Sequence, residues 1–157
     1  MMHESEVFLR PMTGEDVPEV EKLEKDCFSE AWSEKLLQDM LDSEFDEAWV
    51  LVCPDKSVCG YINVRFLAGE GELMRIAIGK EYRGLGYSRK LMEQMMRSAQ
   101  EKNVCDLTLE VRAGNTPAIR LYKSYGFRKE AVRRDYYHAP TEDAFIMWRR
   151  GLPAISS

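Results

Sequence analysis

The stretch Arg83-Gly-Leu-Gly-Tyr-Ser-Arg89 combines residue types that suit an anion. Glycines at 84 and 86 let the backbone turn tightly and approach a ligand. A helical pattern follows directly, and the first amides of a helix carry a partial positive charge that attracts phosphate. Arg83 and Arg89 add guanidinium groups of the kind that bind phosphate oxygens. The alternative is a plain glycine turn into a surface helix, which is the better interpretation of Gly-x-Gly taken alone.

Two familiar phosphate-binding loops do not fit this stretch. A Walker A loop requires Gly-Lys followed by Ser or Thr, which is absent here. A dinucleotide-binding fingerprint requires a third small residue where Arg89 stands. In addition, Asp106 begins its predicted strand, whereas the acid that binds a ribose should end one. The loop therefore predicts an anion site of another kind.

Glu110 and Tyr122 are candidate proton-transfer groups. Residues 104–111 alternate as a strand, which places Glu110 on the polar face near the end of that strand. Tyr122 lies in the helix predicted to begin at Thr116-Pro117, so both side chains could face one cleft. Taken alone, each has a structural alternative: Glu110 is then a solvated carboxylate, and Tyr122 a core aromatic residue.

The elements that must position these residues follow from apolar periodicity and turn residues. We predict strands at 7–10, 48–53, 58–67, 72–78, 104–111, 127–133 and 143–149, with a loop at 136–141 between the last two. Helices are predicted at 13–28, 33–41, from the glycine loop to about 102, and from 116 to Gly126. The buried stripe of the second helix is predicted to be Leu36, Leu37, Met40 and Leu41. The pattern indicates an α+β fold in a single domain over residues 1–157.

Composition excludes several classes of protein. With 45% hydrophobic and 31% charged residues, the chain is typical of a globular protein rather than a disordered one. Its apolar runs are too short to span a membrane and its first residues do not form a secretory leader, so we expect a cytoplasmic protein with no membrane partner. Cysteines 27, 53, 59 and 105 lack metal-binding spacing, so we expect no metal site and no disulfide, but buried thiols.

Charge is distributed unevenly along the chain. Residues 1–50 hold 15 acidic and 4 basic side chains, whereas residues 51–157 hold 12 acidic and 18 basic ones. This division suggests an anionic ligand for the C-terminal two thirds and a cationic partner near the N-terminal third. Ordinary solvated acidic helices are an equally good explanation of the second feature. Nucleic acid is not expected as a partner, because the basic excess is modest and no basic stripe carries interleaved aromatics.

Together these segments resemble a known family. Arg83-x-x-Gly86-x-Ser88, placed after Arg75-Ile-Ala-Ile78, is similar to the acyl-CoA loop of the Gcn5-related N-acetyltransferases (GNAT), although that family usually has glycine or alanine where Ser88 stands. More narrowly, four segments resemble the RimI-type ribosomal-protein-alanine N-acetyltransferases. These are Cys27-Phe-Ser-Glu-Ala-Trp-Ser-Glu-Lys, Leu109-Glu-Val-Arg-Ala-Gly-Asn-Thr-Pro-Ala-Ile, Leu121-Tyr-Lys-Ser-Tyr-Gly-Phe and Arg133-Arg-Asp-Tyr-Tyr. The resemblance implies a three-layer fold: a mixed, mostly antiparallel sheet of six or seven strands with about four helices on its two faces.

The resemblance also implies roles for particular residues. Acetyl-CoA is the expected acetyl donor, and Glu110 and Tyr122 take the positions of the general base and of the acid that protonates the leaving thiolate. Residues expected to bind the donor are Ile76, Ala77 and Ile78 of the preceding strand, Arg83, Gly84, Leu85, Gly86, Tyr87, Ser88 and Arg89 of the loop, and Asn115. Trp32, Tyr136 and Tyr137 lie in segments that flank the acceptor groove of the family, although packing explains each of them equally well.

The function implied is transfer of an acetyl group to the N-terminal α-amine of a protein, most simply a small-subunit ribosomal protein with a basic N-terminus. Two alternatives stay open: an acetyltransferase for a small amine or a lysine side chain, and an acyl-CoA-binding sensor without turnover. Glu110 and Tyr122 argue against a sensor, because a protein that only binds needs neither. We expect a monomer or a weak homodimer.

Overall fold

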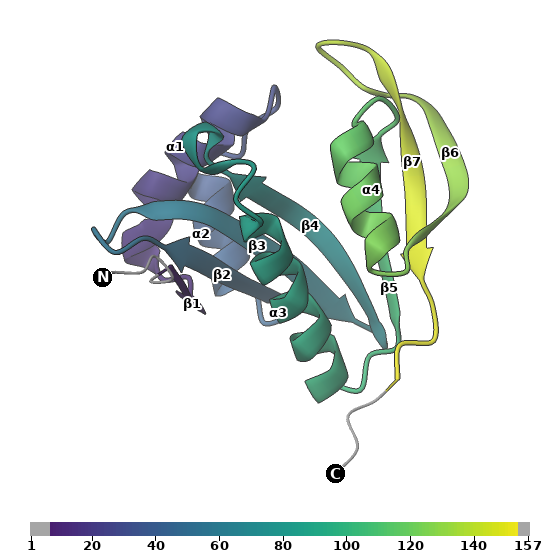
Figure 1. Ribbon diagram of the computed structural model, residues 1–157, viewed down its shortest axis with the longest axis horizontal. Helices are drawn as coiled ribbons and strands as arrows, with labels where there is room; N and C mark the ends of the chain where they lie inside the picture. The colour runs from purple at the N-terminus through teal and green to yellow at the C-terminus, as the bar shows by residue number, and fades with distance from the viewer. Residues whose placement is uncertain (1–6, 154–157) are drawn as a thin grey trace. The chain divides into compact units, whose positions relative to one another are not determined.

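The computed structural model describes residues 7–153, whose strands form a seven-stranded sheet in the order β1-β2-β3-β4-β5-β7-β6 (Figure 1). The strands are β1 (Phe8–Pro11), β2 (Asp46–Val52), β3 (Val58–Leu67), β4 (Glu70–Ile78), β5 (Asp106–Arg112), β6 (Arg128–Tyr137) and β7 (Glu142–Arg149). The helices are α1 (Val17–Cys27), α2 (Glu34–Asp42), α3 (Tyr87–Glu101) and α4 (Thr116–Ser124), with short 3-10 helices η2 (Gly14–Asp16) and η3 (Lys80–Tyr82). β4 and β5 pair in parallel, whereas β1–β2, β2–β3, β5–β7 and β6–β7 pair antiparallel. The predicted mixed, mostly antiparallel α+β architecture is confirmed.

The chain divides into two compact units. The first holds the residues up to Arg65 together with Met74–Gln94, and the second holds Phe66–Leu73 together with the chain from Met95 onward. The boundary falls inside β4 and inside α3, so these two elements contribute residues to both units. The single domain over residues 1–157 stays a prediction.

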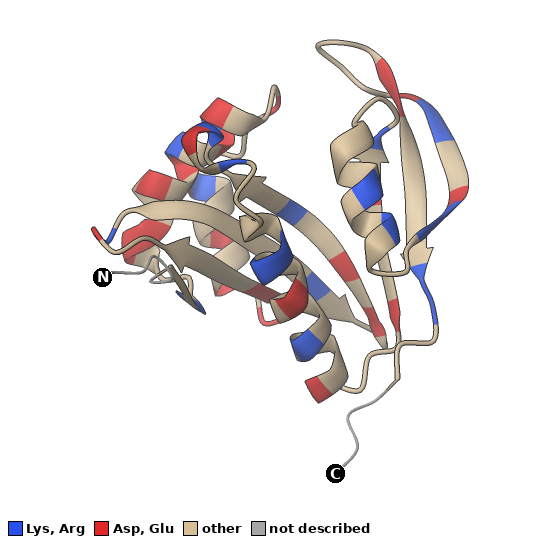
Figure 2. Ribbon diagram, in the orientation of Figure 1, with Lys and Arg blue, Asp and Glu red and all other residues tan. Residues whose placement is uncertain are grey.

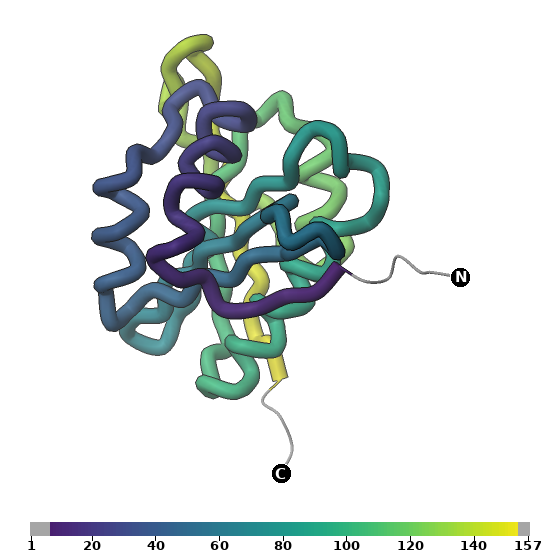
Figure 3. The backbone as a smooth tube through the Cα atoms, turned by 90° about the vertical axis from the view of Figure 1, so that its left-hand side faces the viewer, coloured from purple at the N-terminus to yellow at the C-terminus, as the bar shows by residue number. Residues whose placement is uncertain are grey.

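The core of the first unit lies between two helices and the strands beside them. α1 and α2 contact each other and run beside the strands (Figure 3). Buried apolar residues of both helices form one cluster with residues of the strands. The buried residues of this core are Met12, Val17, Val20, Leu23, Leu37, Met40, Ala48, Val50, Val52, Val58, Tyr61 and Ala77. Burying these side chains at about 25 cal/mol per Å² of apolar surface is the main force that holds both helices on the strands.

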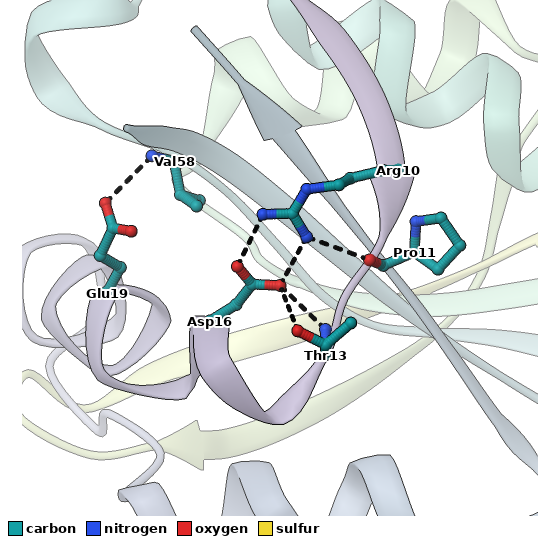
Figure 4. A network of polar contacts seen from close by, with 6 residues as sticks. All are labelled: Arg10, Pro11, Thr13, Asp16, Glu19 and Val58. Atoms are coloured by element: carbon teal, nitrogen blue, oxygen red, sulfur yellow. Dashed lines mark hydrogen bonds and ion pairs between the residues drawn. The ribbon is translucent and has the colours of Figure 1, made fainter. Parts of the chain in front are cut away.

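A polar network fixes the start of the first helix (Figure 4). Arg10 donates two hydrogen bonds to the Asp16 carboxylate, at 2.8 and 2.9 Å, and the Thr13 amide donates a third at 2.8 Å. Burial alone would raise the pKa of Asp16, but the hydrogen bonds from Arg10 and Thr13 outweigh it and lower that pKa. The predicted cap at Thr13 is therefore present, although the first turn is 3-10 and α1 begins only at Val17.

The second helix confirms its predicted cap but not its whole predicted stripe. The Ser33 side chain accepts a hydrogen bond from the Leu36 amide and so caps α2. Leu37 and Met40 are buried and Leu41 is half-buried, whereas Leu36 is 50% exposed. The prediction for Leu36 was wrong, because in this nine-residue helix only residues near one line of the surface reach the core.

The second unit is built on alternation along β5. Leu107, Leu109 and Val111 are buried, while the residues between them lie on the other, partly exposed face, as predicted. Tyr122 of α4 packs edge-on against Phe127, with ring centroids 6.1 Å apart. α4 begins at Thr116, and Gly126 after its end has a positive φ of 89°, which is typical of a helix that stops at glycine.

Several predicted boundaries were wrong by a few residues. β4 begins at Glu70 rather than 72, and Gly71 lies inside the strand, where a Cβ atom would come within 2.7 Å of the Leu107 side chain. β5 begins at Asp106 rather than 104. β6 extends to Tyr137, so Tyr136 and Tyr137 lie in a strand rather than in a loop. Local turn residues did not show this extension, because it depends on pairing between Tyr137 and Glu142 of β7.

The cysteines follow the sequence prediction only in part. Cys53 and Cys59 are buried, Cys27 is half-buried and Cys105 is exposed. All four are free thiols. Cys105 was predicted to be buried, but it lies in the connection before β5, where its backbone carbonyl accepts a hydrogen bond from Leu152. Within residues 7–153, no helix is both long and apolar enough to cross a membrane.

Candidate active site

The glycine loop belongs to the first unit and has the backbone geometry that its sequence predicted. Gly84 and Gly86 have φ angles of 80° and 79°, a region that residues with a side chain rarely adopt. A Cβ atom added at either position would meet nothing within 4 Å. The requirement for glycine is therefore conformational, and the space above the loop is open. Leu85 between them is 59% exposed, which places the tip of the loop at the surface.

Arg83 is turned toward the end of β4. Its Nε donates to the Ile78 carbonyl at 3.0 Å, and its Nη2 lies 3.3 Å from the Cys27 sulfur. The Cys27 thiol also donates to the Ile78 carbonyl, at 3.5 Å. Burial raises the pKa of Cys27, so this thiol keeps its proton at neutral pH. The guanidinium that was predicted to bind phosphate thus fastens the loop to the strand and to the end of α1, and its role toward an anion stays a prediction.

Pairing between β4 and β5 is short. The register joins Glu70–Leu73 to Asp106–Leu109, at the first halves of both strands. Ile76, Ala77 and Ile78 come after the last paired residue of β4. The β4–β5 ladder therefore does not use the backbone groups of these three residues. These groups suit an extended ligand with amides of its own.

The second unit carries the predicted general base. Glu110 lies on the partly exposed face of β5, and its Oε2 is 3.3 Å from Nε of Arg133 in β6. The Tyr136 hydroxyl hydrogen-bonds Glu110, and this bond raises the pKa of Tyr136. The Arg133 guanidinium also lies over the Tyr136 ring, 5.5 Å from its centroid. Two side chains of β6 therefore meet at the Glu110 carboxylate of β5, whose side chain is 25% exposed.

The neighbouring tyrosine is held in a similar way. Arg112 lies over the Tyr137 ring at 4.3 Å from its centroid, and Tyr136 and Tyr137 meet edge-on with centroids 5.1 Å apart. Arg112 also forms an ion pair with Glu142 at 3.3 Å. Of the two tyrosines predicted to flank the acceptor groove, Tyr136 thus contacts Glu110 and Tyr137 packs against Tyr136, and an arginine of β6 or β5 lies over each ring.

Asn115 directly precedes α4, and Tyr122 lies in the second half of this helix. The Asn115 side chain accepts from the Ala118 amide at 3.3 Å, so it caps the helix, and the Gly114 amide donates to Glu142 at 2.5 Å. Tyr122 is only 6% exposed, and its burial, with a smaller contribution from Tyr137, raises its pKa well above the ordinary value. Its hydroxyl therefore stays protonated throughout the neutral range and is available as a donor.

Trp32 belongs to the first unit, in the connection between α1 and α2. Its backbone amide donates to Glu24 at 2.9 Å, and the Arg75 guanidinium lies 4.8 Å from the centroid of its ring. The indole is half-buried, so part of it remains accessible.

The structure thus gathers the predicted residues into two sets. The loop residues, Ile76–Ile78 and Trp32 lie in the first unit, whereas Glu110, Asn115, Tyr122, Tyr136 and Tyr137 lie in the second. Sequence reasoning missed Arg133 as the partner of Glu110. Its only signal was membership of the Arg133-Arg-Asp-Tyr-Tyr segment, which gives no indication of which carboxylate it meets.

Comparison with known proteins identifies the family. Residues 17–127 match the model of the Acetyltransferase (GNAT) family. The chain belongs to the GNAT acetyltransferases. This assignment confirms the resemblance read from the glycine loop and makes the protein an N-acetyltransferase, with Glu110 and Tyr122 as the candidate proton-transfer groups of a GNAT site.

Individual GNAT relatives are similar along most of the chain. A protein of Bacillus subtilis described as a putative [ribosomal protein bS18]-alanine N-acetyltransferase is 30% identical over 141 residues, which cover 89% of this chain and 93% of the relative. The [ribosomal protein bS18]-alanine N-acetyltransferase of Escherichia coli is 32% identical over 138 residues, covering 84% and 89%. The crystal structure of the ribosomal-protein-S18-alanine N-acetyltransferase from Escherichia coli superposes with a TM-score of 0.86 at 28% identity, covering 96% of each chain.

Proposed function

We propose that this GNAT protein transfers the acetyl group of acetyl-CoA to the N-terminal α-amine of a ribosomal protein, in the cytoplasm and by direct attack within a ternary complex. The observation that carries the proposal is the arrangement around Glu110: a partly exposed carboxylate, hydrogen-bonded by Tyr136 and paired with Arg133, on the strand that precedes the helix of Tyr122. Relatives that match most of the chain are named for the same reaction.

Acetyl-CoA fits the residues that would hold it. The open space above Gly84 and Gly86 allows a pyrophosphate to approach the backbone, and the amides at the start of α3 point their partial positive charge toward it. Ile76–Ile78 offer the backbone groups for the pantetheine amides. Asn115 already caps α4, so any contact with the donor would use what that hydrogen bond leaves free. No metal takes part in this scheme.

The chemistry requires one proton acceptor and one proton donor. The amine nitrogen forms a bond with the thioester carbonyl carbon, and the carbon–sulfur bond breaks. Glu110 takes the proton of the amine, directly or through water, and Tyr122 gives its proton to the departing sulfur. An α-amine with a pKa of about 7.8 is roughly 14% neutral at pH 7, whereas a lysine at about 10.4 is roughly 0.04% neutral. A single carboxylate is therefore sufficient for an α-amine.

A panel of peptides tests the acceptor. Release of thiol from acetyl-CoA should require a free N-terminus, with the N-terminal alanine peptide of a small-subunit ribosomal protein as the preferred acceptor. Peptides with a blocked N-terminus and free lysines should give no turnover. Turnover with lysines or small amines alone would favour the alternative acceptor, and binding of acetyl-CoA without turnover of any amine would favour a sensor.

A substitution tests the base. Glu110→Gln keeps the shape but cannot accept a proton, so turnover should fall by about 10²-fold at pH 7. Part of the loss should be recovered as the pH rises, because the amine then deprotonates without help. Glu130→Gln is the matched control, since Glu130 is also a carboxylate paired with an arginine, Arg150, in the same unit. A loss with Glu110→Gln that is flat across pH would indicate a structural role instead.

A further inference from the structure

A buried ionic cluster lies beneath the connection between α1 and α2. The Glu24 side chain is fully buried at 0% exposure, and both of its oxygens accept hydrogen bonds from the guanidinium of Arg75 in β4. The Tyr61 hydroxyl of β3 also donates to Glu24. Burial raises the pKa of Tyr61 well above its usual value, so this hydroxyl remains a donor. A charge this deeply buried is tolerated only because it is paired and hydrogen-bonded in this way.

The same cluster holds the connection Phe28–Trp32, which we call the acceptor-side loop. The Arg75 guanidinium lies 4.0 Å from the centroid of the Phe28 ring and 4.8 Å from that of the Trp32 ring. Its Nη2 donates to the Glu30 carbonyl at 3.3 Å, and the Trp32 amide donates to Glu24 at 2.9 Å. Two aromatic rings, one carbonyl and one amide of a five-residue loop therefore depend on Arg75 and its partner.

Arg75 also stands next to the strand segment that would hold the donor. It directly precedes Ile76–Ile78 in β4, and all the contacts above lie within the first unit. We propose that Arg75 is a positioning residue for the acceptor: it fixes the acceptor-side loop to β4, so that Trp32 meets the acceptor peptide in a set position relative to the thioester. This inference rests on the proposed function, and it assigns Arg75 no contact with either substrate.

A planar guanidinium is essential to this arrangement. It lies over two aromatic rings while its nitrogens bind both oxygens of a carboxylate, whereas a lysine ammonium is a point charge that cannot do both. Arg75→Lys therefore keeps a cation for Glu24 but releases the loop. The KM for the acceptor peptide should rise about tenfold, while kcat should fall less and the Kd of acetyl-CoA should stay within twofold.

The chain offers a matched control in Arg65→Lys. Arg65 of β3 also uses its Nε and Nη2 to grip a buried carboxylate, Asp46, at 3.3 and 3.1 Å, and Asp46 is 1% exposed. The same substitution there also removes a contact of two guanidinium nitrogens with a buried carboxylate, here with its single oxygen Oδ2, without touching the acceptor-side loop. It should leave the acceptor KM unchanged.

A second measurement follows the loop itself. In a background where Trp49 and Trp148 are replaced by Phe, acrylamide quenching of Trp32 fluorescence should increase with Arg75→Lys and not with Arg65→Lys. If the parent protein acetylates the peptide but both lysine variants show equal KM values and equal quenching, Arg75 is only structural and this inference is wrong. If the parent protein acetylates no peptide, the proposed function itself is overturned.

Discussion

Gly86 provides the sharpest test of the donor site. Its φ of 79° lies where an L-residue costs about 1–2 kcal/mol, while an added Cβ atom would meet nothing within 4 Å. Gly86→Ala thus introduces strain without a clash. In the free variant the loop can leave this strained conformation, and it must return to it when CoA binds. Binding therefore costs about 1–2 kcal/mol more, and the Kd for CoA should rise about 5–30-fold. Titration calorimetry measures this change directly.

Gly69→Ala is the matched control. Gly69 has the same φ of 79° and the same open space, but it lies in the turn between β3 and β4. Both variants should lose similar stability in thermal unfolding, whereas only Gly86→Ala should weaken CoA. Gly86→Asn separates the causes further, because asparagine tolerates this backbone conformation but places a side chain in the path of the ligand. A Kd for Gly86→Ala within twofold of that for Gly69→Ala would refute the donor site at this loop.

Three further predictions concern proton transfer, stability and steering. Tyr122→Phe should lower kcat by about 10²-fold, and because burial raises the pKa of Tyr122, the parent enzyme should show no loss of kcat from this group up to about pH 10. The lowered pKa of Asp16 means that its ion pair stabilises the fold above about pH 4, the range of the unfolded carboxyl, and that this stability is lost as the pH falls through the lower folded value. Asp16→Asn should therefore reduce stability to urea at pH 7 and flatten its decline in acid. The acidic side chains of α1, α2 and their flanks are expected to steer a basic peptide (Figure 2), so the kcat/KM for such a peptide should fall between 0.1 and 1 M salt, as the Debye length shrinks from about 10 to about 3 Å. The double variant Glu15→Lys, Glu34→Lys should lower this kcat/KM without changing the Kd of CoA. An equal salt response of a neutral peptide would contradict steering.

Local sequence signals predicted most elements of the fold and the chemistry of the loop. Gly84 and Gly86 were informative because their positive φ angles strongly favour glycine, and the alternation along β5 placed Glu110 on the partly exposed face correctly. The contacts of Glu110 were not predictable in the same way. Its pairing with Arg133 and Tyr136 depends on the registers by which β7, which lies between β5 and β6, pairs with each of them, and these registers are a property of the sheet rather than of any one segment.

The cluster around Glu24 shows the same limit more strongly. Glu24, Tyr61 and Arg75 come from a helix and two strands that are far apart in the sequence. Glu24 counts among the acidic residues of the first fifty, which suggested solvated surface or steering, yet its side chain is fully buried and forms an ion pair with Arg75. The number of acidic residues in a segment does not distinguish a carboxylate that faces water from one that is buried in the core.

The position of β6 at the end of the strand order has a consequence for behaviour at high protein concentration. An outermost strand offers unpaired backbone groups to any other extended chain, and uninterrupted edges promote aggregation. β6 is exposed almost throughout, but its register shifts twice against β7 and it carries four cationic side chains, Arg128, Lys129, Arg133 and Arg134. Irregular geometry and mutual repulsion both oppose stacking of one copy on the next. Arg133, which pairs with the candidate base Glu110, is one of these four cations, so we expect it to contribute to this repulsion as well.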